Sequence, residues 1–139
     1  MKRFRADLHI HTCLSPCAEL EMNPREIVEA ARGKGIDIIA ITDHNSAENV
    51  EAVRGAALGK GVTVLGGMEV TSSEEVHLLA LFAEREQLLR MQDIVYENLP
   101  SGENDERLYG RQVIVNETTS DDRPSTTSVI RMRARVRLI

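Results

Sequence analysis

The chain has 139 residues, which is enough for one domain with a modest hydrophobic core. Hydrophobic residues make up 42% of it, yet there is no Trp and only two Phe and two Tyr, so the core must be aliphatic. No apolar run approaches the ~20 residues that cross a bilayer, and two cysteines are too few for a disulfide framework. We therefore expect a protein without a membrane span, located in the cytoplasm.

The net charge is −5 and is unevenly distributed. All 22 acidic residues lie within residues 1–122, whereas residues 123–139 carry five arginines and no acid. The acidic body disfavours nucleic-acid binding through phosphate neutralisation. Charged and apolar residues alternate over 131–139. This pattern suits an edge strand with a basic face, or equally a frayed chain end whose apolar side chains have nothing to pack against.

The first third of the chain predicts a strand, a long loop and a helix. Residues 4–10 read as a strand, and residues 12–22 form a loop long enough to suggest a function. Asn23 is a helix cap, and Glu26 three residues later completes a capping box. Gly33 ends this helix.

The middle of the chain predicts a further strand and helix. Residues 36–42 are almost all apolar, which is typical of a strand covered on both faces in a parallel sheet. A second capping box at residues 45–48 predicts the start of a helix that ends at Gly59.

A hairpin and a third helix are predicted next. A strand over 62–65 is broken by Gly66-Gly67 and continues over 68–70, and residues 76–82 form another strand. The short connection between these two strands excludes a parallel crossover. A helix follows over 84–99, and then an acidic loop over 101–110 and a short strand over 112–115.

All four histidines border predicted strands. His9 and His11 are two residues apart, so a strand places them on the same face. His44 follows the next strand, Glu69 lies at the end of the third strand, and His77 lies near the start of the fourth. An isolated pair of this kind is usually two ordinary strand histidines, but three such positions indicate a metal site at the carboxyl edge of a parallel sheet. Imidazole and carboxylate ligands suit Zn, Mn or Fe, and Glu69 is positioned to bridge two ions.

The stretches DLHIHT, ITDHN, GMEV and VHLLALF, in this order, resemble the PHP (polymerase and histidinol phosphatase) domain family over about the first hundred residues. The resemblance implies an α/β fold, the N-terminal part of a distorted (β/α)7 barrel, with a phosphoesterase site for two or three divalent ions. It implies as ligands His9, His11 and Glu69 on one ion, Glu19 and His44 on a second, and Glu69 with His77 on a third. Glu21 is the alternative to Glu19.

Other polar residues near the expected site have less certain roles. Asp7 is two residues from His9 and Asp43 is next to His44, so each could accept a second ring N–H or steady a metal-bound water, although Asp7 suits a surface position equally well. We interpret Cys13 and Cys17 as loop-packing residues rather than metal ligands. Arg123 suits either a contact to a substrate phosphate or an ordinary surface position.

Together these features predict a metal-dependent phosphoesterase that hydrolyses a small phosphate ester or nucleotide. Two ions ~3.5–4 Å apart would activate a shared water for in-line attack on phosphorus. The alternative is a truncated PHP fragment, weak or inactive in catalysis, that serves as a metal-binding or assembly module. We consider this alternative because members of the family have further metal ligands later in the chain, whereas no histidine follows His77 here. We therefore expect weak metal binding and low activity. The expected divisions are an α/β core over 1–99, an acidic loop and strand over 100–122, and a basic segment over 123–139.

Overall fold

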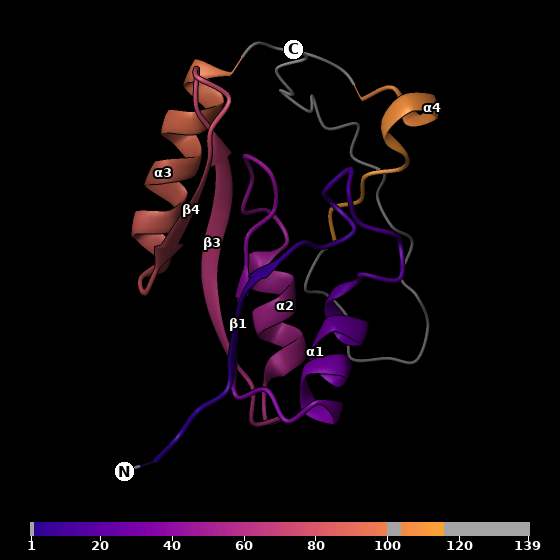
Figure 1. Ribbon diagram of the computed structural model, residues 1–139, viewed down its shortest axis with the longest axis vertical. Helices are drawn as coiled ribbons and strands as arrows, with labels where there is room; N and C mark the ends of the chain where they lie inside the picture. Colours follow the sequence, from indigo (N-terminus) through magenta and orange to yellow (C-terminus); the bar gives the residue numbers. More distant parts are fainter. Residues whose placement is uncertain (1, 100–103, 116–139) are drawn as a thin grey trace.

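A computed structural model describes residues 2–99 and 104–115, which form a four-stranded sheet with helices (Figure 1). The strands are β1 (Ala6–Ile10), β2 (Ile38–Ile41), β3 (Thr63–Thr71) and β4 (His77–Phe82). The helices are α1 (Pro24–Gly33), α2 (Val50–Ala57), α3 (Arg85–Asn98) and α4 (Glu106–Tyr109). The strands are adjacent in chain order, with β1 to β3 parallel and β4 antiparallel to β3. The predicted α/β class and the predicted hairpin are both confirmed.

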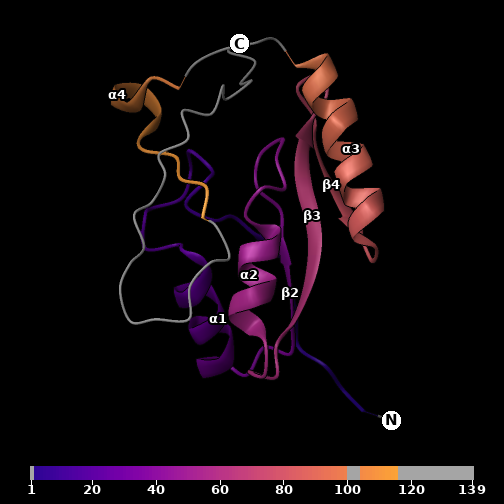
Figure 2. The ribbon, with the colours of Figure 1, turned by 180° about the vertical axis from the view of Figure 1, so that it is seen from behind.

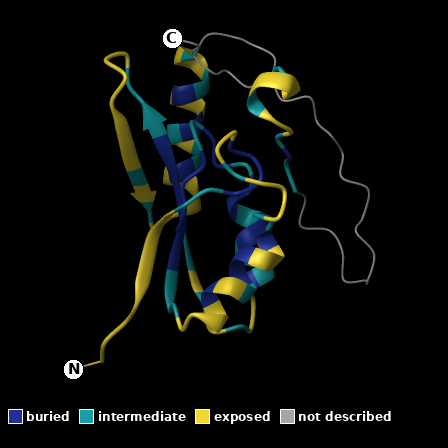
Figure 3. Ribbon diagram, turned by 45° about the vertical axis from the view of Figure 1, so that its right-hand side comes forward, coloured by how far each residue is buried: buried dark blue, intermediate teal, exposed yellow. Residues whose placement is uncertain are grey.

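Helices α1, α2 and α3 cover one face of the sheet. Helices α1 and α2 lie side by side, and α3 runs along β3 and β4 (Figures 1 and 2). The core between helices and strands includes Val28, Ile39, Val53, Met68 and Leu88. The other face is open, since Leu79 and Leu81 of β4 are 44% and 38% exposed, and Figure 3 shows β1 and β4 as largely exposed strands. Within the described ranges, no helix is both long and apolar enough to span a membrane.

Helices α1 and α3 form where the sequence pattern predicts them. The side-chain oxygen of Asn23 accepts two backbone N–H groups of the first turn of α1, including that of Glu26, each at 3.1 Å. Helix α3 lies within one residue of its predicted bounds, and Leu88 and Val95 on its apolar side are buried. Local capping chemistry and helical periodicity therefore suffice for these two elements.

The predicted capping box at residues 45–48 is wrong, because α2 begins at Val50. Asn45 adopts the left-handed conformation with φ of 52°, and its side-chain oxygen accepts the backbone N–H of Thr71 at 2.9 Å. The backbone N–H of Ala47 bonds to the side chain of Gln92 in α3 at 2.8 Å. Tertiary contacts to β3 and α3 thus take the groups that would otherwise have started the helix.

The predicted break at Gly66-Gly67 is also absent, and β3 runs through both glycines. On the helix-covered face, a Cβ at Gly66 would lie 2.6 Å from Leu88 Cδ2. On the open face, a Cβ at Gly67 would lie 2.6 Å from the carbonyl oxygen of Ala80. These glycines therefore serve close packing rather than a turn.

We expect Gly67→Ala to lower the free energy of unfolding by about 1–3 kcal/mol, because the new methyl group overpacks against the backbone of β4. Gly33→Ala at the end of α1 is the matched control, since an added Cβ there has nothing within 4 Å. Urea unfolding of both variants measures the difference. Equal midpoints for the two would contradict the close approach of β3 and β4 at Gly67.

The segment after α3 differs from its prediction. The predicted acidic loop contains the short helix α4, in which the Asp105 side chain accepts the backbone N–H of Arg107 at 3.0 Å. Residues 111–115 form no strand, because their backbone bonds to a loop and to a side chain instead of to a strand. The N–H of Val113 bonds to the carbonyl of Cys13 at 2.9 Å, and the N–H of Val115 bonds to the Asn49 side chain at 2.8 Å. Arg123 and the rest of the predicted basic segment lie outside the described residues.

Candidate metal centre

Five side chains predicted as ligands meet at the carboxyl edge of the parallel strands. His9 lies in β1, and His11 follows just beyond the end of this strand. The pairing of β2 with β3 continues past β2 as an isolated bridge, which sets His44 opposite Glu69. The antiparallel return of β4 then brings His77 to the same place. Residues that are far apart in the sequence thus meet because their strands are neighbours.

The Glu69 carboxylate is the centre of this group and is 6% exposed. Its Oε2 lies 2.9 Å from Nε2 of His9, 2.9 Å from Nε2 of His11 and 3.7 Å from Nδ1 of His44. Its Oε1 lies 2.6 Å from Nδ1 of His77. One carboxylate therefore faces four imidazoles, and each of its oxygens serves a different side of the group.

The electrostatics of the group favour ligand-competent protonation states. Burial raises the pKa of Glu69, but hydrogen bonds from His9 and His77 and the charges of His44 and His11 outweigh it and lower the pKa to about 2. Burial lowers the pKa of His11 and of His44. An ionised carboxylate beside neutral imidazoles is the form in which these residues bind divalent metals.

Asp43 organises the loop next to this group and is fully buried. Its oxygens accept the backbone N–H and the hydroxyl of Thr12, both at 2.7 Å, and the hydroxyl of Ser15 at 2.6 Å. Burial raises the pKa of Asp43, and these hydrogen bonds oppose the rise. The predicted direct bond from a histidine ring N–H to Asp43 is absent, and Asp43 instead contacts His11 through the Ser15 hydroxyl.

Ser15 determines which nitrogen of His11 carries the proton. Because its hydroxyl donates to Asp43, its oxygen is left to act as an acceptor, from the backbone N–H of His44 at 3.2 Å and from Nδ1 of His11 at 3.0 Å. The Nε2 of His11 is then unprotonated and presents its lone pair to Glu69 and His9. This is the arrangement by which outer residues orient a metal-binding histidine.

The residues present fit a divalent metal. Nε2 of His9, Nε2 of His11 and Oε2 of Glu69 lie 2.9–3.0 Å from one another, somewhat less than the separation of about 3.4 Å between ligands of a tetrahedral zinc ion, so a small outward movement would fit them to one ion. Without a cation a single proton serves this triangle, donated by Nε2 of His9 to Glu69 and to the unprotonated Nε2 of His11, and a bound metal would take its place. A shared cation would satisfy all three lone pairs.

Three groups of described residues have their ligand atoms within 4.8 Å of one another. They are His9, His11 and Glu69; His44, Glu69 and His77; and His11, Cys17 and His44. The first group, and the pairing of Glu69 with His77, agree with the ligand sets implied by the family resemblance. In the third group, Cys17 stands beside His44, where the resemblance implied Glu19.

The remaining predicted residues lie away from these groups. Glu19 and Glu21 are exposed, and neither belongs to any of the three groups found among the described residues. Asp7 is exposed as well, and its Oδ1 accepts the backbone N–H of His9 at 3.4 Å rather than a ring N–H. The structure therefore does not bring these carboxylates to the histidines, and a ligand role for Glu19 stays a prediction.

Sequence reasoning missed Thr12, Ser15 and Asn49, all of which are buried polar residues. Asn49 donates from Nδ2 to Thr12 Oγ1 and to the carbonyl of Val113, both at 2.9 Å. It thereby ties the loop beside the histidines to the segment after α4. No periodicity marks such residues in the sequence, because their partners lie far away along the chain.

Comparison with known proteins identifies the family. The family model for the PHP domain matches residues 7–119. The chain belongs to the PHP domain family. Its four strands form part of a PHP-type (β/α) barrel, with the histidines and Glu69 at the carboxyl edge of the parallel strands.

Two relatives that are named for an activity are similar to a little over half of the chain. Phosphoribosyl 1,2-cyclic phosphate 1,2-diphosphodiesterase from Eggerthella lenta is 30% identical over 83 residues, covering 56% of this chain and 30% of that protein. The 3',5'-nucleoside bisphosphate phosphatase from Chromobacterium violaceum is 31% identical over 78 residues, covering 54% and 26%. The chain spans 26–46% of the length of the four curated relatives it matches.

Solved structures show the same fold. A Bifidobacterium adolescentis protein assigned as a metal-dependent phosphoesterase superposes with a TM-score of 0.51 at 28% identity, covering 66% of this chain and 33% of that one. An amidohydrolase from Chromobacterium violaceum, solved with sulfate and no metal, gives a TM-score of 0.53 at 26% identity, covering 67% and 34%. Both likenesses extend over about two thirds of this PHP chain.

Proposed function

We propose that this PHP chain provides metal ligands for the hydrolysis of a small phosphate ester or nucleotide. The observation that carries the proposal is the Glu69 carboxylate, which lies within 3.7 Å of the imidazoles of all four histidines. The relatives named as a diphosphodiesterase and as a bisphosphate phosphatase support this reaction class. Both act on phosphate esters of small molecules, by their names.

In this proposal, His9, His11 and Glu69 hold one divalent ion, and Glu69 with His77 contributes to another. The ions would be Zn, Mn or Fe, and would supply charge for the phosphate oxygens and lower the pKa of a bound water. Glu69 brings the two groups together, because its two oxygens face different histidines. Ser15 and Asp43 hold the ring of His11 in the protonation state that binds metal.

A phosphate ester can reach this group from the open side. The side chains of His9 and His77 are 49% and 51% exposed, whereas that of Glu69 is 8% exposed. Ligands that are half exposed leave room for a substrate oxygen beside them, as a catalytic metal requires.

Both cysteines are free, which suits the cytoplasmic location that we propose.

The test is metal-dependent hydrolysis by the purified chain. We expect the chelator-treated protein to regain hydrolysis of a nitrophenyl phosphate monoester or diester after addition of Zn, Mn or Fe(II), and His44→Ala to lose it. Glu97→Gln, a change at an exposed position of α3, is the control that should leave the rate unchanged. Metal retention without hydrolysis in the wild type would contradict the phosphoesterase proposal and favour a binding module.

A further inference from the structure

We infer that Cys17 is a metal ligand and that, with His44, it forms a thiolate and imidazole site which favours zinc over manganese. The inference rests on the proposed metal centre and extends it to a residue that the sequence places only in a loop. It gives Nε2 of His44 a ligand partner, since the other ring nitrogen, Nδ1, is the one that faces Glu69. A loop thiol thereby becomes part of the site.

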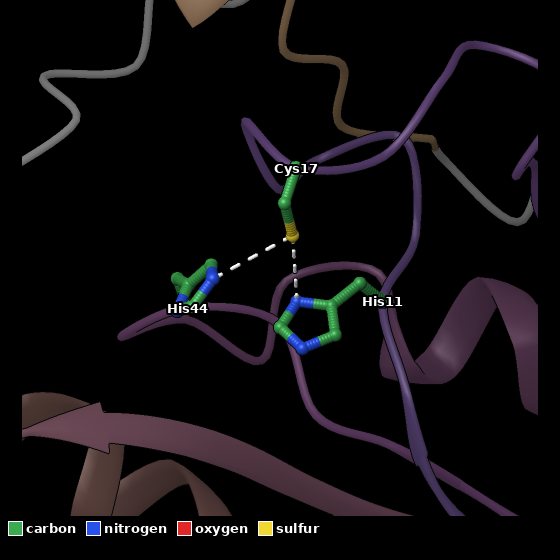
Figure 4. A group of neighbouring side chains, drawn as sticks. All are labelled: His11, Cys17 and His44. Atoms are coloured by element: carbon green, nitrogen blue, oxygen red, sulfur yellow. Dashed lines mark hydrogen bonds between the residues drawn. The ribbon is translucent and has the colours of Figure 1, made fainter. Parts of the chain in front are cut away.

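The distances around Cys17 are those between metal ligands. Its Sγ lies 3.6 Å from Nε2 of His44 and 3.5 Å from Nδ1 of His11, and Figure 4 shows the sulfur directed toward both rings. A tetrahedral zinc ion with its usual Zn–S and Zn–N bond lengths separates these two ligand atoms by about 3.5 Å. Nδ1 of His11 directs its proton to Ser15, so His44 is the partner that can share a cation with the thiolate.

The two nitrogens of His44 face different groups. Nε2 faces Cys17, and Nδ1 lies 3.7 Å from Oε2 of Glu69. A metal-binding histidine commonly directs its other ring N–H to a carboxylate, which holds the ring and increases its basicity. Binding through Nε2 would leave Nδ1 facing Glu69 at 3.7 Å, which is ion-pair range and is longer than a hydrogen bond.

The loop that carries Cys17 is held in place on both sides of the thiol. Ser15, two residues before it, is bonded to Asp43, and the N–H of Ala18 bonds to the carbonyl of Ser15 at 3.1 Å. The other cysteine points elsewhere: Cys13 is 2% exposed, and its Sγ lies 3.7 Å from the carbonyl of Val113. The two thiols therefore have different environments, and only Cys17 faces the histidines.

A thiolate changes which metal the site prefers. Thiolate is a soft ligand that suits zinc, whereas manganese prefers carboxylate, carbonyl and water oxygens. With Cys17 in place of a loop carboxylate, the His44 site should select zinc. Replacing the thiol with a serine hydroxyl should remove this selectivity and leave the Glu69 group intact.

The experiment is a Co(II) titration of the metal-free chain, kept reduced, followed by absorption spectroscopy. Visible bands report Co(II) bound in a site of low symmetry, and a sulfur-to-cobalt charge-transfer band in the near ultraviolet reports a thiolate ligand. We expect both in the wild type and in the control Cys13→Ser, and only the visible bands in Cys17→Ser. We expect the zinc affinity of Cys17→Ser to fall by at least about tenfold, because losing a residue that only supports a metal ligand already costs about that much. The manganese affinity of the same variant should stay unchanged.

A second measurement does not depend on spectroscopy. Bound zinc should slow the alkylation of Cys17 by iodoacetamide, as located by mass spectrometry of the peptide. Visible cobalt bands without a charge-transfer band, or unprotected alkylation at saturating zinc, would overturn the role of Cys17 and leave the proposed function standing. Failure of the wild type to bind cobalt or zinc at all would overturn the metal centre itself.

Discussion

Glu69→Gln is expected to lower the affinity for divalent metal by more than about a hundredfold. Loss of a residue that only supports a metal ligand costs up to about that factor, and Glu69 is a proposed ligand itself. The glutamine keeps the size of the side chain and one oxygen, but it loses the charge that four imidazoles face. Its amide NH2 would also point a proton at one of these rings. Because the two oxygens of Glu69 serve both sides of the group, metal binding at both should fall together.

Calorimetric titration with zinc and with manganese measures this loss, and hydrolysis should disappear with it. The backbone of Glu69 bonds to Asp43 and Asn45, so the strand pairing should survive and the circular dichroism spectrum should not change. Glu97→Gln is the control for removal of one negative charge. A second variant, His77→Ala, should lower the metal affinity less than Glu69→Gln does, because His77 contacts only Oε1 of the carboxylate. Wild-type metal affinity in Glu69→Gln would rule out the bridging role.

Asp43→Asn is expected to lower the free energy of unfolding by about 2–4 kcal/mol, since a buried donor left without an acceptor costs about 1–3 kcal/mol and more beside a charge. Three donors from Thr12 and Ser15 converge on the carboxylate, and an amide presents two protons to them in place of one acceptor oxygen. The loop of residues 12–22 should loosen as a result. Urea denaturation measures the change in stability.

Asp37→Asn is the matched control for Asp43→Asn. The Asp37 carboxylate accepts one backbone N–H, from Arg5, at an exposed position, and an amide oxygen can still accept that bond. Its effect should stay within the ordinary surface range of about 0.5 kcal/mol. Equal losses in the two variants would show that the loop does not depend on the buried carboxylate. Metal affinity should also fall in Asp43→Asn alone, through the orientation of His11.

The local elements follow from local signals. The apolar runs of β2 and β4, the cap at Asn23 and the stripe of Leu88 and Val95 on α3 are each contained within a few residues, and each element forms where its pattern indicates. The start of α2 does not follow its local pattern. The helix begins at Val50 and not at the predicted capping box, because Asn45 of that box bonds to a strand more than twenty residues away. The same reason applies to the glycines of β3, whose neighbours come from α3 and β4.

What the sequence determined by itself is the order of strands and helices from β1 to α3 and the edge at which the histidines and Glu69 gather, because a period of two and parallel pairing bring such residues together. Only the tertiary structure decided that Cys17 rather than Glu19 faces His44, and that Ser15 links Asp43 to His11. Loop side chains have no periodicity, and their positions depend on hydrogen bonds to Asp43, which is 28 and 31 residues from its partners. Such bonds exist only after the sheet has brought distant segments into contact.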